Sequence, residues 1–135
     1  MERYKRPDTK NALSIAEAAK RDMDFTLDSL AVNESSGPTI VRNIYECFRM
    51  LGDALLTLKG IKISDHVMQV KQLLKLRVKT LRPMQLIDNM RILRHNINYY
   101  GHKPTILEVE DAISLAKACF NPVYTEVIKM INEVR

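Results

Sequence analysis

Residues 93–102 read LRHNINYYGH and concentrate the side chains of this sequence that are best suited to chemistry. Arg94 carries a permanent positive charge that can pair with a phosphate or a carboxylate. Imidazole is a group that titrates near neutral pH, so His95 and His102 are candidates for an acid, a base or an anion-binding group. The stretch therefore has two interpretations: an anion-binding or catalytic cluster, or the polar side and frayed end of a helix.

Placed on a helix at about 100° per residue, this stretch has two sides. Apolar side chains gather on one of them, which we expect to pack in the core: Leu86, Met90, Leu93, Ile97 and Tyr100. The predicted binding face lies opposite and consists of Arg91, Arg94, His95 and Asn98. Tyr99 can add stacking, although we expect Tyr99 or Tyr100 to be buried against neighbouring helices.

Acidic residues are missing from this part of the sequence. None occurs between Asp88 and His102, so the arginines are expected to lack the usual acidic partners one turn away. Such a surface suits a phosphate or a carboxylate. A turn at Gly101 should end the helix and leave His102 free to fold back.

A second polar stripe, with alternating charge, is predicted on the helix that contains residues 42–53. Arg42, Glu46, Arg49 and Asp53 recur at helical spacing. The stripe is either a self-neutralising surface or the half-buried lining of a helix–helix contact or polar groove.

The elements that must position these residues are predicted to be helices. Helical periodicity predicts helices over about 8–32, 36–59, 64–82, 84–100 and 105–132, capped at Asp8, Ser36, Ser64 and Thr105. Glu108 stands at capping-box spacing from Thr105, Gly60 is a natural C-terminal cap, and Pro122 should kink or break the last helix. No run alternates long enough to predict a strand. The fold class is all-α: one domain, residues 1–135, forming an antiparallel bundle of four long helices with a shorter or broken partner.

Composition excludes several classes of protein. With 46% hydrophobic and 27% charged residues, the chain should fold around a core rather than remain disordered. The net charge of +5 is mild and spread along the sequence, which permits an anionic partner without requiring one. We expect a cytoplasmic chain, because the charged first residues do not form a signal peptide and no apolar run could span a membrane.

Motifs for other chemistries are missing. The sequence contains no P-loop, dinucleotide-binding, HExxH or GxSxG motif, and its histidines and cysteines lack metal-ligand spacing, so we predict neither a cofactor nor a metal site. Cys47 and Cys119 are expected to be small core residues, and His66 is expected to organise its loop.

Two segments resemble the HEPN domain family (higher eukaryotes and prokaryotes nucleotide-binding), especially its archaeal-type members. Residues 40–66, IVRNIYECFRMLGDALLTLKGIKISDH, resemble the family's aromatic-bearing helix with its short Gly-containing loop and following histidine. Residues 93–102 resemble the later signature, an arginine commonly followed by asparagine and then by a histidine after about four to six residues. With the helix order, the resemblance covers roughly residues 10–132.

The resemblance implies an all-α bundle that dimerises with its signature helices facing each other. Many members are metal-independent ribonucleases or toxins paired with a small nucleotidyltransferase, and others are non-catalytic. Arg94 carries over well, but seven residues separate it from His102, and His95 stands where asparagine is usual. We therefore predict a non-catalytic homodimer that binds a nucleotide, RNA or a protein partner. The alternative is a metal-independent endoribonuclease or toxin in which Arg94 stabilises the phosphate and either His102 or His95 is the base.

Overall fold

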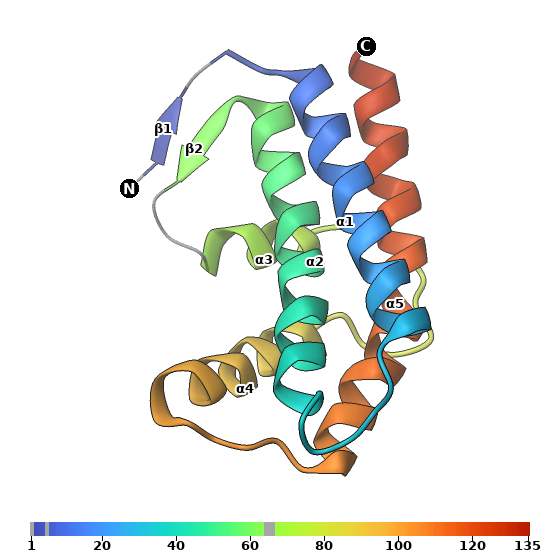
Figure 1. Ribbon diagram of the computed structural model, residues 1–135. Coiled ribbons are helices and arrows are strands. Elements are labelled where there is room, and N and C mark those ends of the chain that lie inside the picture. Colours follow the sequence, from blue (N-terminus) through green and yellow to red (C-terminus); the bar gives the residue numbers. More distant parts are fainter. Residues whose placement is uncertain (1, 5, 64–66) are drawn as a thin grey trace.

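The structure is a computed structural model that describes residues 2–4, 6–63 and 67–135, and it confirms the all-α bundle (Figure 1). The helices in these residues are α1 (Thr9–Ser29), α2 (Gly37–Lys59), α3 (Val67–Leu74), α4 (Leu86–Tyr100) and α5 (Ile106–Val134). Three of them are long, at 21, 23 and 29 residues, and α4 has 15. Helix α3 has 8 residues and ends at Leu74, so the predicted helix over about 64–82 was wrong beyond that residue.

The central element of the fold is α2. Its apolar stripe of Ile44, Phe48, Leu51 and Leu55 is fully buried, and α1, α3, α4 and α5 all pack against α2. The rings of Phe48 and Phe120 meet edge-to-face at 5.5 Å and join α2 to α5. Figure 1 shows α1 running opposite to α2 and α5, while the short α4 lies across the end of the bundle.

Helix ends follow local sequence signals at most positions. Asp8 accepts a hydrogen bond from the Asn11 N–H at 2.9 Å, and Gly60 and Gly101 end α2 and α4 in the left-handed conformation, as predicted. Thr105 and Glu108 form the predicted capping box. Ser36 precedes α2 but does not cap it through its side chain, because its hydroxyl donates to carbonyls in the preceding turn.

Pro122 does not interrupt α5, which continues as one helix to Val134, so the predicted possibility of a broken last helix is excluded. The neighbouring turns of α5 are packed in the core through Ala118, Cys119 and Val123, which supports the helix where proline lacks its N–H. The predicted Ser64 cap and the predicted loop role of His66 lie outside the described residues.

Two short strands were missed by the sequence analysis. β1 (Glu2–Tyr4) pairs antiparallel with β2 (Ile61–Ile63), with Arg3 opposite Lys62. Each strand has three residues, too few for alternation to be recognised, and the partners are about sixty positions apart. In the part of the chain that the structure describes, no helix has both the length and the apolarity needed to cross a bilayer.

Gly52 sets the distance between α2 and α3. It is buried, and a Cβ atom at this position would collide with the backbone carbonyl of Gln69. We predict that Gly52→Ala lowers the free energy of unfolding by about 1–3 kcal/mol, because the α3 backbone must move. Without the collision, alanine would stabilise α2 by about 0.5–1 kcal/mol, because it loses less backbone entropy than glycine on folding. The sign of the change in the free energy of unfolding therefore decides the test.

Urea unfolding followed by circular dichroism would measure this change. Ser14→Ala, at an exposed position of α1, is the control and should stay within about 0.5 kcal/mol of the parent protein. A stabilised Gly52→Ala protein would show that α3 does not approach α2 so closely.

Candidate functional site

The inner side of α4 faces α2 and brings polar residues of the two helices together. The Arg94 guanidinium lies over the Tyr45 ring, 5.6 Å from its centroid. One turn away, the Arg42 side chain is 3.5 Å from the Asn98 side-chain oxygen, at the limit of a hydrogen bond. We call Arg42, Tyr45, Arg49, Arg91 and Arg94 the arginine cluster.

Tyr45 forms the neutral floor of the arginine cluster. Its side chain is 1% exposed, and burial raises the pKa of its hydroxyl, while the charges of Arg94, Arg91 and Arg49 lower that pKa by less. The net pKa is above the ordinary value of 10.0, so Tyr45 stays protonated at neutral pH. The ring thus offers its face to a cation without adding a negative charge.

Acidic residues neutralise part of the arginine cluster. Asp88 pairs with Arg91 at 2.9 Å, and Glu46 binds Arg49 through both carboxylate oxygens. The hydrogen bond to Glu46 is the main reason that the pKa of Arg49 is raised. The prediction that the cations of α4 lack acidic partners was therefore wrong for Arg91.

Arg94 is different, because it makes no ion pair with the described part of the chain. Its guanidinium instead contacts the Tyr45 ring. Both interpretations of the α2 stripe find support: Glu46 and Arg49 neutralise each other, and Arg42 lines the contact with α4. Sequence reasoning did not connect Arg42 and Arg49 to Arg94. A signal was present, because Arg42, Tyr45 and Arg49 stand at positions i, i+3 and i+7 and therefore share one face of α2.

His95 makes its ring contacts with Tyr99 and Tyr100 rather than with the arginine cluster. The His95 ring lies 4.6 Å from the Tyr99 ring and 5.7 Å from the Tyr100 ring. Tyr99 is 70% exposed and Tyr100 is 76% exposed. The predictions that Tyr100 belongs to the buried stripe and that at least one tyrosine is buried were therefore wrong; the rest of that stripe is buried or half-buried.

His102 lies beyond the end of α4, as predicted, and is linked to the start of α5. Its backbone N–H donates to the Asn96 carbonyl, and its Nε2 atom is 3.1 Å from Glu108 Oε1. The same carboxylate oxygen accepts the Thr105 N–H of the capping box. The predicted site residues thus fall into three groups: Arg91, Arg94 and Asn98 toward α2, His95 with the two tyrosines, and His102 with Glu108.

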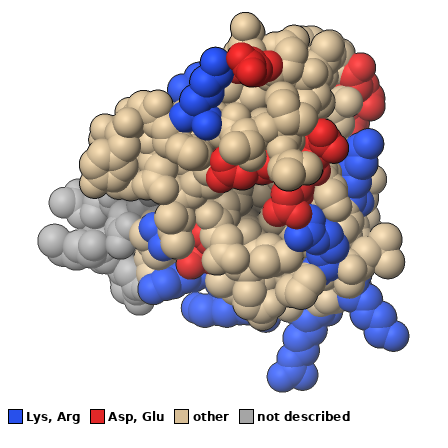
Figure 2. Space-filling view, turned by 90° about the horizontal axis from the view of Figure 1, so that it is seen from below, with Lys and Arg blue, Asp and Glu red and all other residues tan. Residues whose placement is uncertain are grey.

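The surface charge near this end of the bundle is mixed. Figure 2 shows acidic groups across the middle of the face seen from below, a basic group directly beside them, and further lysines and arginines around the edge. The basic groups on this face therefore do not form one continuous patch, and a bound anion would be selected by local geometry rather than by the average charge.

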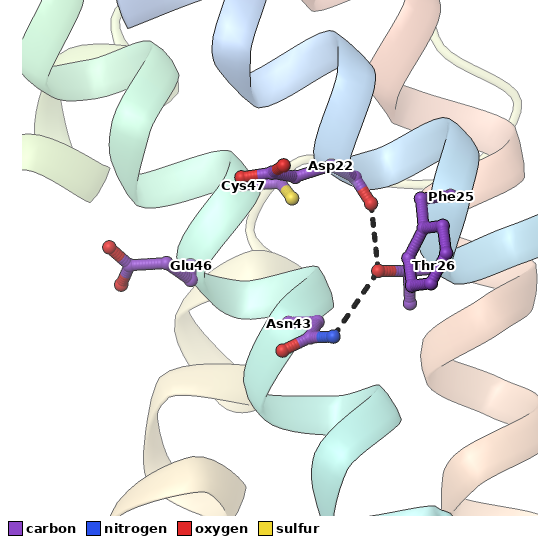
Figure 3. Close-up of a pocket in the computed structure, with 6 residues that line it drawn as sticks. All are labelled: Asp22, Phe25, Thr26, Asn43, Glu46 and Cys47. Carbon is purple, nitrogen blue, oxygen red and sulfur yellow. Dashed lines mark hydrogen bonds between the residues drawn. The ribbon is translucent and has the colours of Figure 1, made fainter. Parts of the chain in front are cut away.

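A cavity of about 220 Å³ lies between α1 and α2 (Figure 3). Its lining residues are Asp22, Phe25, Thr26, Asn43, Glu46 and Cys47. The Thr26 hydroxyl donates to the Asp22 carbonyl at 2.8 Å and accepts from Asn43 at 3.4 Å. Burial raises the pKa of Cys47 to about 12, so its thiol is a poor nucleophile. Cys47 and Cys119 are both free and buried, as predicted.

Among the described residues, no three His, Cys, Asp or Glu side chains are grouped so as to hold a metal ion. Comparison of the chain with protein-family models, with curated proteins and with solved structures gives no match.

The Glu108 carboxylate makes helix capping sensitive to pH. The Thr105 N–H is the largest cause that lowers its pKa below the usual 4.5, and His102 lowers it further. Because the pKa is lower in the folded protein, ionised Glu108 stabilises the fold above pH 4.5, and this contribution is lost as the pH falls through the folded-state pKa. We predict that Glu108→Gln is less stable than the parent protein near neutral pH and that the difference shrinks in acid.

Urea unfolding at a series of pH values would test this linkage. Glu110→Gln, which removes an exposed carboxylate two residues away, is the matched control for the loss of one charge from the same helix. A Glu108→Gln difference that is constant across the series would contradict the linkage.

Proposed function

We propose that this protein is a non-catalytic, HEPN-like homodimer that binds the phosphate of a nucleotide or of RNA at Arg94. The observation that carries the proposal is the state of Arg94: it is half-buried, is held over a neutral ring and makes no ion pair with the described residues. A guanidinium in this state has its hydrogen-bond donors available for two phosphate oxygens. Arg42 and Asn98, one turn further, can add polar contacts.

Exposed aromatic rings elsewhere on α4 support a nucleotide rather than a simple anion. Nucleobases stack on tyrosine and histidine, and His95 and Tyr99 present their rings to solvent on the turn that follows Arg94. The same surface, extended by Ile92 at 50% exposure, can instead pack against a second copy of the chain. Light scattering at micromolar concentration should then report a dimer.

A metal-independent endoribonuclease is the second candidate, and the contact between His102 and Glu108 favours it. A carboxylate 3.1 Å from Nε2 can orient an imidazole, as a general base requires. Arg94 would stabilise the scissile phosphate. In this case the protein could be a toxin, with a nucleotidyltransferase-type protein as its partner.

We predict that Arg94→Ala weakens the binding of a fluorescent single-stranded RNA by about tenfold at low salt, the cost of one charge-assisted contact. Asp88→Asn should strengthen binding, because it removes one negative charge close to the site. Fluorescence anisotropy measures both changes. Arg21→Ala, at an exposed position of α1, is the matched control and should have little effect. Equal losses for Arg94→Ala and Arg21→Ala would contradict a specific site.

The two candidates differ in a cleavage assay. If the protein is a ribonuclease, incubation with single-stranded RNA and EDTA should yield fragments that end in 2′,3′-cyclic phosphate, and both Arg94→Ala and His102→Ala should abolish them. The non-catalytic proposal predicts binding without fragments. Cleavage that persists in His102→Ala would exclude His102 as the base.

A further inference from the structure

The connection between α3 and α4 carries a second group of cations. From Lys75 to Arg82 the chain is not helical, and exposed and half-buried residues alternate without exception. The outward side chains at the first three exposed positions are Lys75, Arg77 and Lys79, which we call the cationic strip. The intervening Leu76 and Val78 pack against the hydrophobic core. Alternation of this kind indicates an extended backbone with one face held by the protein and one face in solvent.

The backbone of the cationic strip is anchored at its end. The Arg82 carbonyl accepts hydrogen bonds from the Thr80 hydroxyl at 2.6 Å and from the Cys119 thiol at 3.3 Å, and the Arg82 side chain pairs with Asp111 at 2.9 Å. These contacts attach the connection to α5, along which it passes in Figure 1. The cations therefore project from a positioned segment rather than from a free loop.

The charge of the cationic strip is not compensated locally. Residues 67–87 contain no aspartate or glutamate. None of the three side chains of the strip forms an ion pair or a hydrogen bond with the described part of the chain, whereas Arg82 and Arg91 each have an aspartate partner. Three adjacent exposed cations without acids repel one another, and a bound polyanion would relieve that repulsion.

We propose that the cationic strip binds the sugar–phosphate backbone of single-stranded RNA, outside the Arg94 site and without reading its sequence. Alternate residues of an extended chain are about 6.6 Å apart, so the strip presents its positive charges in a row. The phosphates of a single strand of RNA form a matching row of negative charges. The strip has no aromatic side chain on which a base could stack. A membrane surface fits less well, because the apolar side chains within the strip point inward; Leu81, 91% exposed, follows it.

This inference takes its ligand class from the proposed function, but it depends on different residues. The test is a triple variant, Lys75→Gln, Arg77→Gln and Lys79→Gln, and the matched control carries Lys10→Gln, Arg21→Gln and Lys129→Gln. The control residues are exposed on α1 and α5, and both variants lose the same net charge. Circular dichroism should report the parent fold for both, because every substituted side chain is on the surface.

Affinity for a single-stranded RNA of about 20 nucleotides is measured over a series of salt concentrations. The plot of log K against log salt has a negative slope, and the strip variant should reduce its magnitude by about 2, from three phosphate contacts at about 0.7 each. Its affinity at low salt should fall at least about tenfold. The control should keep the parent slope. A mononucleotide, which reaches only the Arg94 site, should bind the strip variant as it binds the parent protein.

The outcomes separate the two proposals. Loss of RNA binding in the strip variant, with no effect of Arg94→Ala on RNA or mononucleotide, would support the strip and overturn the Arg94 site. An unchanged salt slope in the strip variant, or an equal change in the control, would overturn the strip whatever Arg94 does. Selective loss of binding to phosphatidylserine-containing vesicles, with RNA binding intact, would overturn it in favour of a membrane surface.

Discussion

The burial of α2 is the constraint on which the rest of the structure depends. Four helices pack around it, and apolar residues from Ile40 to Leu58 are removed from water on nearly every side. A helix with this environment has little room for charged side chains, which must reach water or find partners. Arg42 and Arg49 therefore emerge on the side where α4 crosses α2. The arginine cluster lies on that side, and buried apolar residues occupy most of the rest of α2.

The same packing explains why one arginine differs from its neighbours. Arg49 and Arg91 find acids one turn away on their own helices, as side chains at helical spacing usually do. Arg94 has no acid within its own turn and instead meets the ring of a tyrosine on another helix. Burial of Tyr45 raises its pKa and keeps its side chain neutral, so Tyr45 does not neutralise the positive charge of Arg94. Binding an anion from solution would supply this half-buried cation with the counterion that the described residues do not provide.

The two proposed contact surfaces have different mechanical origins. The arginine cluster is held by the packing of two helices, whereas the cationic strip is held by core side chains and by hydrogen bonds at Arg82 within a non-helical connection. Separately from both surfaces, the contact between His102 and Glu108 connects the turn after α4 to the first turn of α5. Each surface is thus positioned by contacts of its own, so each can be removed by substitution without loss of the others.

The sequence by itself determined what depends on neighbours within about four residues. Asp8, Gly60, Gly101 and the Thr105–Glu108 pair mark helix ends, and the apolar periodicity of α2 identifies its buried stripe, because both signals act within one or two helical turns. Tertiary structure alone decided which side of α4 meets α2, why Tyr99 and Tyr100 stay in solvent, and how β1 finds β2. It also decided that Arg94 lies over Tyr45. These outcomes require residues about fifty or more positions apart to meet, and the local sequence does not encode which of its apolar and charged faces another helix will cover.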